Sequence, residues 1–381
     1  MSSLSAANGA FAFRLLKLLC PDDPADNVFF SPVSVSSVMA MVLLGAKGDT
    51  GAQIAQVLAL NPKGDIHGGF QSLLTQVNRP GAPFSLSIAN RLFADKNWKF
   101  LPSCTESCLK FYRAEVDQLP IAEDPEKSRK HINTWASKRT EGKIQELLAE
   151  GSLGKGIRLI LVNAVYFKGR WDQQFEESST RTMPFKINQK EQRPVQMMYQ
   201  EARLPLAYVR ELGTQVLELP YTGRELSMVI VLPVEGVDLS TVEKSLTFEK
   251  FQSWTSAEQM KSTEVEVFLP RFKLQEDYDM GSVLQRLGMV HAFEQGSADL
   301  TGMVADRDLC LSRFVHRSVV EVNEEGTEAA AAAACDVVDS FHEMSGPVFR
   351  ADRPFLFFIK HNKTNSLLFC GRFSSPEGCT Y

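Results

Sequence analysis

The sequence lacks the features that mark membrane proteins and nucleic-acid-binding proteins. No stretch of it approaches the ~18 consecutive apolar residues that a membrane-spanning helix needs. Acidic residues outnumber basic ones by 46 to 41, so the net charge of −5 offers no basic surplus to a polyanion. A short basic cluster at 127–131 adjoins Glu123, Asp124 and Glu126, which is typical of a solvated helix face. We therefore expect no membrane partner and no nucleic-acid partner.

Cysteine usage and the amino terminus bear on the compartment. The seven cysteines are odd in number and scattered, without the spacing of a disulfide framework. Cys104 and Cys108 can share a helix face, but no second pair completes a zinc site, so we expect no metal. The first residues, Met1-Ser2-Ser3-Leu4, lack the basic segment, apolar core and cleavage site of a secretory signal. These features predict a cytoplasmic protein with free thiols and no cleavable signal peptide, and they leave nuclear entry open.

The sequence also lacks the common catalytic motifs. It contains no Gly-x-Ser-x-Gly elbow and no Gly-x-x-x-x-Gly-Lys-Ser/Thr loop. The glycines at 151–156 lie between a predicted helix and a predicted strand, which is the wrong context for a dinucleotide loop. The six histidines are isolated from one another, and a lone His beside apolar residues, such as His316, is usually a hydrogen-bonded structural residue. We predict a protein that is not an enzyme and that needs no cofactor.

Apolar patterns fill most of the chain, and their order indicates the fold class. Residues 4–19 and 34–46 are predicted to be helices, as are residues 126–149 with an interruption at Gly142. Residues 159–167 form a continuous apolar run, which is typical of a central strand covered on both faces. Later strands are predicted at 215–219, 226–232, 264–269, 319–323, 355–359 and 366–372. Helices early in the chain and strands late, with no linker between them, predict one α+β domain spanning 1–381 with antiparallel sheets.

One segment has two plausible conformations. Six alanines at 329–334 follow the run Glu324-Glu325-Gly326-Thr327-Glu328. Because alanine is the best helix former, the run alone reads as a helix. It follows a strand-like stretch at 317–322, however, and as a strand its small residues could enter a packed sheet without overpacking it. The residues alone leave helix and strand open.

Several separated motifs resemble those of one protein family. They lie at 27–34, 43–48, 161–171, in the alanine run, and at 349–359. In this order they resemble the serpin family along essentially the whole chain, and within it the ovalbumin-type, intracellular branch. Segments 131–135, 193–201 and 276–280 are similar to cytoplasmic members of that branch that inhibit granzyme B. The resemblance implies three β-sheets, about nine helices and an exposed reactive-centre loop at about 324–348.

The resemblance also implies a mechanism, that of a suicide-substrate inhibitor of a serine protease. The protease cleaves the loop and becomes acylated, and the cut loop then enters the central sheet as a new strand and distorts the protease. Carried over by motif, the hinge of this loop is Glu325, Gly326, Thr327, Glu328, Ala329, Ala330 and Ala331. The residues of the hydrogen-bonded shutter under the sheet and of the breach at its top are Ser31, Ser34, Asn163, Trp171 and His316. One departure is Arg353, which stands where this family usually has His.

The residues of the loop bear on the target. Counting by the family's usual loop length from Gly326 predicts the scissile bond Ser340–Phe341, with Asp339–Ser340 as the alternative. The loop has no Arg or Lys between 326 and 348, whereas a trypsin-like protease needs a cation for its buried carboxylate. Asp339 suits a protease with a basic specificity pocket, such as granzyme B, and Phe341 suits a chymotrypsin-like protease. We expect a monomeric inhibitor that forms a covalent complex with such a protease.

Two other functions stay open from the sequence. A non-inhibitory serpin could serve in binding, storage or as a chaperone, although such members usually have bulky or charged hinges. The tetrapeptide at 336–339 also resembles a caspase recognition site, which would fit a cross-class inhibitor of caspase-like cysteine proteases.

Overall fold

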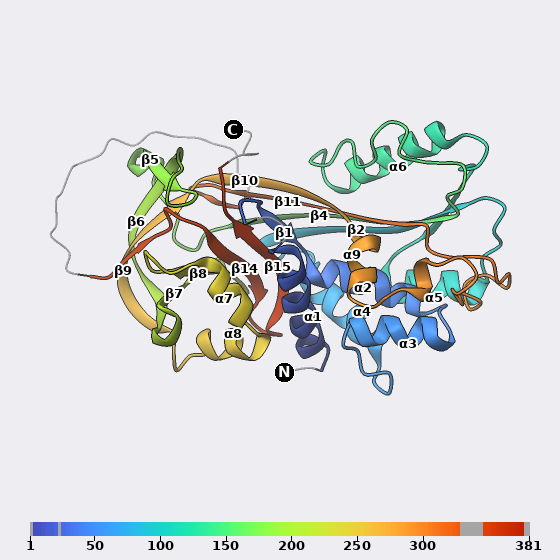
Figure 1. Ribbon diagram of the computed structural model, residues 1–381, viewed down its shortest axis with the longest axis horizontal. Helices are drawn as coiled ribbons and strands as arrows, with labels where there is room; N and C mark the ends of the chain where they lie inside the picture. Colours follow the sequence, from blue (N-terminus) through green and yellow to red (C-terminus); the bar gives the residue numbers. More distant parts are fainter. Residues whose placement is uncertain (1–2, 22–23, 328–345, 377–381) are drawn as a thin grey trace.

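The computed structural model describes residues 3–21, 24–327 and 346–376, which form an α+β fold (Figure 1). The α-helices of this described part are α1 (Ser3–Leu19), α2 (Pro32–Leu43), α3 (Gly48–Val57), α4 (Ile66–Val77), α5 (Pro102–Tyr112), α6 (Pro125–Arg139), α7 (Leu239–Ser245), α8 (Phe248–Trp254) and α9 (Met280–Arg286). Short 3-10 helices lie at η1 (Glu177–Ser179), η2 (Arg210–Leu212) and η3 (His291–Phe293). Figure 1 shows α6 on one side of the long strands and α1 to α5 on the other.

The central sheet, called sheet A below, has six strands. In spatial order they are β10 (Phe272–Asp279), β11 (Arg313–Val322), β12 (Gly326–Thr327), β4 (Leu159–Arg170), β2 (Phe84–Asp95) and β3 (Val116–Leu119). Below the short β12, the strands β11 and β4 also pair directly with each other and run parallel. The prediction of antiparallel sheets is therefore wrong here, because a long connection between β4 and β11 allows both to run in the same direction.

A second sheet has nine strands: β1 (Val28–Phe30), β15 (Ser366–Phe373), β14 (Phe355–His361), β8 (Leu226–Pro233), β7 (Thr214–Pro220), β6 (Gln192–Val209), β9 (Lys261–Pro270), β13 (Val348–Arg350), and β5 (Arg181–Lys186), which pairs with β6. The long strand β6 pairs with β5 along its first residues, with β9 along its middle part and with β7 along its last residues. Strand β6 is therefore shared by two parts of the nine-stranded sheet, and sheet A is the third sheet of the fold. This arrangement agrees with the three sheets that the serpin resemblance implies.

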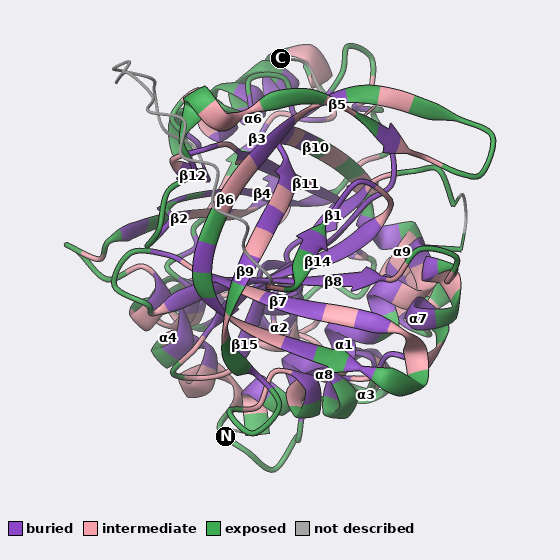
Figure 2. Cartoon of the chain, turned by 90° about the vertical axis from the view of Figure 1, so that its left-hand side faces the viewer, coloured by how far each residue is buried: buried purple, intermediate pink, exposed green. Residues whose placement is uncertain are grey.

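Burial follows from the sequence pattern. The apolar run at 159–167 is buried on both faces of β4, as predicted. Leu161 and Val165 pack into the main core, whereas Ile160 and Val162 pack into a smaller cluster under α6. Figure 2 shows β8 and β14 as buried strands inside the second sheet.

One predicted helix ends early. The structure ends α6 at Arg139, and residues 140–149 lie outside any helix, so the prediction of a helix to 149 is wrong. Glu141 and Gly142 both have positive φ angles, 53° and 79°, which a helix cannot accommodate. The segment instead places Ile144, Leu147 and Leu148 in the small cluster under α6.

Candidate functional site

The two residues of strand β12 lie at the top of sheet A, between β11 and β4. Gly326 is opposite Arg170 and Thr327 is opposite Gly169 on β4, while Thr327 is also opposite Val322 on β11. Because β11 and β4 are parallel to each other, β12 runs antiparallel to both. The predicted hinge therefore begins inside the sheet, in the position that a new strand would take.

A tight turn connects β11 to β12. The Asn323 side-chain oxygen accepts hydrogen bonds from the backbone N–H groups of Glu325 and Gly326, each at 3.1 Å. Gly326 has a φ of +151°, and a Cβ there would lie 2.2 Å from the Gly169 carbonyl oxygen. Only glycine fits this position, for both backbone and steric reasons.

Trp171 clamps this turn from the β4 side. Its backbone N–H donates to the Glu325 carbonyl at 2.8 Å, and its indole N–H donates to the Asn323 carbonyl at 2.9 Å. The indole stacks on Tyr221 with the ring centres 4.7 Å apart. The Tyr221 hydroxyl in turn lies 3.0 Å from the hydroxyl of the fully buried Thr327. These contacts connect Thr327 to Tyr221, which directly follows β7 of the second sheet.

Glu324 anchors the other side of the turn through a partly buried ion pair. Arg271, directly before β10, contacts the Glu324 carboxylate through two nitrogens, at 2.6 and 3.2 Å. Thr180 donates a further hydrogen bond to the carboxylate at 2.6 Å. Burial favours the neutral acid, but these hydrogen bonds outweigh it and lower the pKa of Glu324. Sequence reasoning missed Arg271, Thr180 and Tyr221, because nothing in their local patterns distinguishes them from other polar residues.

Ser31, His316 and Asn163 meet where α2 crosses beneath sheet A. The Ser31 backbone N–H points at His316 Nε2 at 3.2 Å, so Nε2 must be the acceptor. The proton of the neutral imidazole therefore lies on Nδ1, which donates to the Asn163 side-chain oxygen. Complete burial lowers the pKa of His316 to about 3, so this ring stays neutral near pH 7.

The hydrogen-bond chain continues across the sheet in one direction. The Asn163 amide donates to Asn90 on β2, and the Asn90 amide donates to the Ser37 hydroxyl at 3.2 Å. Ser37 then donates to the Ser34 carbonyl at 2.9 Å. The Ser34 hydroxyl itself has no partner within the described residues, so Ser34 takes part through its backbone.

The result is a link between α2, β11, β4 and β2. His316 and Asn163 face each other in register across the parallel β11–β4 pair. The structure thus brings Ser31, Ser34, Asn163 and His316 together, and it places Trp171 apart from them, at the top of the sheet. Any strand that extended β12 downward would have to separate His316 from Asn163.

The remaining predicted loop residues lie outside the described residues. They are Glu328, Ala329, Ala330 and Ala331 of the hinge, and Asp339, Ser340 and Phe341 of the predicted scissile bonds. At the far end of the loop, Val348–Arg350 forms β13, which pairs in parallel with β9. Both described ends of the loop are therefore parts of sheets.

Arg353 is accommodated in place of the expected histidine. Its Nε donates to the Pro233 carbonyl at 2.9 Å, and one terminal nitrogen contacts the Arg350 carbonyl and the Asp352 carboxylate at 3.3 and 2.7 Å. The guanidinium thus joins the end of β8 to the end of β13. A charge fixed at this position has acceptors on three sides, so the departure from the family pattern leaves no unpaired cation.

Membrane-spanning helices, metal-binding clusters and cysteines were also considered in the sequence. Within the described residues, no helix combines the length and apolarity needed to cross a bilayer. The same residues contain no group of three or more His, Cys, Asp or Glu side chains placed to hold a metal ion. Their cysteines, Cys20, Cys104, Cys108, Cys310 and Cys370, are all free thiols.

Comparison with known proteins supports the resemblance seen in the motifs. A family described as "Serpin (serine protease inhibitor)" matches residues 6–376. Serpin B9 of Homo sapiens is 64% identical over 376 residues, covering 99% of this chain and 100% of the relative. The leukocyte elastase inhibitor of Equus caballus is 47% identical over 380 residues, with 99% and 100% covered. The crystal structure of uncleaved ovalbumin matches with a TM-score of 0.89 at 34% identity, covering 98% of this chain and 100% of ovalbumin.

Proposed function

The chain belongs to the serpin family of serine protease inhibitors, and on that premise we propose that it traps its target protease by inserting its cleaved loop between β11 and β4. The observation that carries this mechanism is the position of β12. Gly326 and Thr327 already pair with both neighbouring strands. Insertion then needs only to extend a strand that has begun, and it needs no new nucleation at the top of sheet A.

The registers of β12 predict where each following residue would go. Continued along β4, they bring Ala329 opposite Phe167 and Ala331 opposite Val165. Continued along both strands, they bring Ala333 between Asn163 and His316. These odd-numbered residues would share the buried face of Thr327, where alanine adds no volume that the core must accommodate. On the opposite face Glu328 would lie beside the exposed Lys168, a favourable cross-strand pair.

Insertion exchanges one set of strand contacts for another. It separates the parallel pair that runs from Arg313–Ile160 to Val319–Tyr166. In return the new strand forms antiparallel pairs on both of its sides, and antiparallel pairing is slightly more stable per residue than parallel pairing. The intact protein is thus a metastable state, and cleavage releases the loop to complete the sheet. Trapping succeeds when this step is faster than hydrolysis of the acyl bond.

We propose an Asp-preferring protease such as granzyme B as the target, with a chymotrypsin-like protease as the second candidate. The acidic loop supports the first, because Asp339 would enter a basic specificity pocket at the Asp339–Ser340 bond. Phe341 supports the second, because a chymotrypsin-like protease cleaves after an aromatic residue, which here is the bond one position beyond the predicted Ser340–Phe341 bond. The free thiols of the described cysteines support residence in the cytoplasm, where reducing conditions maintain them.

The test is to incubate the protein with granzyme B and, separately, with chymotrypsin. We expect a complex that survives SDS for at least one protease, and mass spectrometry of the released fragment identifies the cleaved bond. Clean loop cleavage without any complex, and without a gain in thermal stability of the cleaved protein, would indicate a non-inhibitory serpin instead. Complex formation with a caspase that is lost in Asp339→Ala would support the cross-class alternative.

A further inference from the structure

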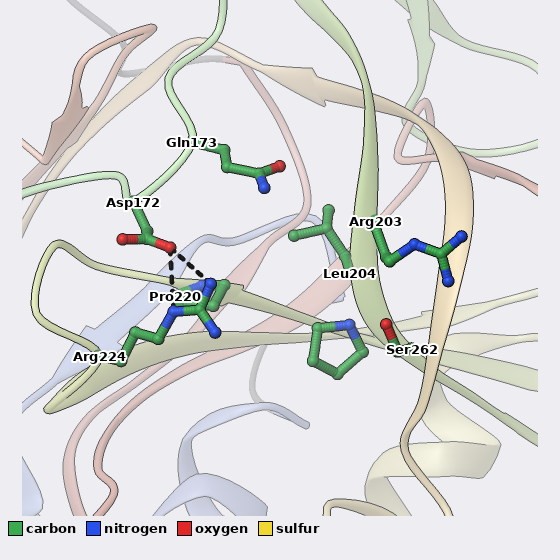
Figure 3. A pocket seen from close by; sticks show the side chains of 8 residues that line it. Asp172, Gln173, Arg203, Leu204, Pro220, Arg224 and Ser262 are labelled. Atoms are coloured by element: carbon green, nitrogen blue, oxygen red, sulfur yellow. Dashed lines mark hydrogen bonds and ion pairs between the residues drawn. The ribbon is translucent and has the colours of Figure 1, made fainter.

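A pocket of about 300 Å³ lies at the base of the reactive loop, and the trapping mechanism does not use it. Figure 3 shows its lining from four parts of the chain. Asp172 and Gln173 follow β4, Leu204 lies on β6, Arg224 lies on the turn between β7 and β8, and Ser262 lies at the start of β9. A pocket of this volume can receive one or two side chains of a partner.

The two ends of the reactive loop lie on opposite sides of this pocket. At one end, Asp172 directly follows Trp171, which holds the Glu325 carbonyl. At the other end, the pocket residue Arg203 is opposite Glu264 in the β6–β9 pair. On the far side of β9, the backbone at Gly346, the first described residue at the far end of the loop, lies so close that a Cβ there would be 2.9 Å from the Glu264 carbonyl oxygen. A protease that engages the loop must therefore approach the mouth of this pocket.

Two arginines give the pocket its chemistry. Arg224 contacts the Asp172 carboxylate through two nitrogens at 3.1 and 3.0 Å, and Arg203 contacts Glu264 at 2.9 Å. The arginine side chains are 70% and 62% exposed, against 27% and 45% for their acidic partners. The cations are therefore more exposed than the anions. Because ion pairs at such exposure contribute only ~0.2–1 kcal/mol, an incoming carboxylate can compete for either guanidinium.

The backbone around Arg224 holds this residue in place. Its φ of +58° is unusual for a residue other than glycine. Its N–H donates to the Tyr221 carbonyl at 2.8 Å, and its carbonyl accepts from the Asn362 amide at 2.9 Å. These bonds reduce the freedom that the arginine would lose on binding a partner.

We propose that this pocket is an exosite that receives an acidic side chain of the target protease when the protease engages the loop. The proposal rests on the inhibitory function proposed above and adds a second determinant of specificity. The bait is acidic, and the exosite exposes two guanidinium groups more than it exposes their acidic partners. The matching protease must then combine a basic specificity pocket with an acidic group on the rim of its active-site cleft, which distinguishes it from other Asp-preferring proteases.

The test compares Arg203→Glu, Arg224→Glu and the double variant with the wild-type protein, using granzyme B. Arg139→Glu is the matched control for each single variant, because Arg139 is an exposed arginine in the last turn of α6 and its replacement gives the same change in net charge. We expect the association rate constant of the double variant to fall about tenfold at low salt, with a smaller difference at high salt. The number of inhibitor molecules consumed per protease trapped should stay unchanged.

Four outcomes would overturn the exosite. Equal association rates in the double variant and the wild type would exclude it, as would an equal fall in Arg139→Glu. A rise in inhibitor consumed per protease would show that the arginines act on the hinge through Trp171. If the wild-type protein formed no complex with granzyme B or chymotrypsin, the proposed function would fail and the exosite with it. Thermal unfolding of each variant checks that the fold is retained.

Discussion

Thr327→Arg is expected to convert the inhibitor into a substrate. Thr327 has no exposed surface, and its hydroxyl lies 3.0 Å from that of Tyr221 beside the Trp171 ring. In the intact protein an arginine there could leave the sheet together with the two-residue β12. After cleavage the extended strand would hold residue 327 in place, and the guanidinium would be buried without an acidic partner.

The size of the effect follows from that burial. Burying an unpaired charge costs several kcal/mol, for which we take about 3 to 5 kcal/mol. If most of this cost is present when the strand enters the sheet, insertion slows by a factor on the order of 10² to 10³, since about 1.4 kcal/mol corresponds to tenfold. Hydrolysis of the acyl bond then occurs before insertion, and the protease is released active.

The assay mixes equal amounts of protease and variant and compares the SDS-stable complex with cleaved inhibitor. Thr327→Val is the matched control, because it keeps the shape and removes only the contact with the Tyr221 hydroxyl. That loss is about 1 kcal/mol, so this variant should trap most of the protease. A Thr327→Arg protein that traps protease as well as the wild type would refute strand insertion at this position.

Three other changes test the groups around sheet A. Burial, with the nearby charges of Asp277 and Asp26, raises the pKa of Glu276 to about 7, so the native state loses stability as pH rises from about 4.5 to 7. Glu276→Gln should therefore raise the free energy of unfolding by about 1 kcal/mol at pH 8, after discounting for solvent exposure, and change it little at pH 4. An equal gain at both pH values would contradict this prediction. The pKa of Glu324 is lowered, so its ionised carboxylate stabilises the folded protein above pH 4.5, the ordinary pKa, and this stabilisation is lost as pH falls through the folded-state pKa. Glu324→Gln should therefore lower the melting temperature at pH 7 and remove this part of the loss of stability in acid. Thermal scans across pH 3 to 7 measure both effects. Asn163→Ala leaves the buried His316 N–H without its acceptor and should cost about 2 to 3 kcal/mol in urea unfolding; an unchanged midpoint would show that the shutter chain does not stabilise the intact protein.

Several residues of the candidate site could be predicted from the sequence, because its motifs resemble those of the serpin family. The motifs at 27–34 and 161–171 marked Ser31, Ser34, Asn163 and Trp171, and Gly326 could be placed within the hinge. Their partners could not be found in this way. Arg271 is one of many arginines in the chain, and only the folded structure places its guanidinium on Glu324.

The sequence by itself determined the chemistry of the loop and the identity of several strands. Small residues after Gly326, an acidic bait without Arg or Lys, and apolar runs of strand length are properties of neighbouring residues, and they can be read locally. Only the tertiary structure decided that β11 and β4 are parallel neighbours with β12 already begun between them. It also decided which partners hold that arrangement closed: Ser31 and His316 lie 285 positions apart in the chain, and Trp171 and Asn323 lie 152 apart. Contacts over such separations depend on how the whole chain packs, because no local preference of either residue selects the other.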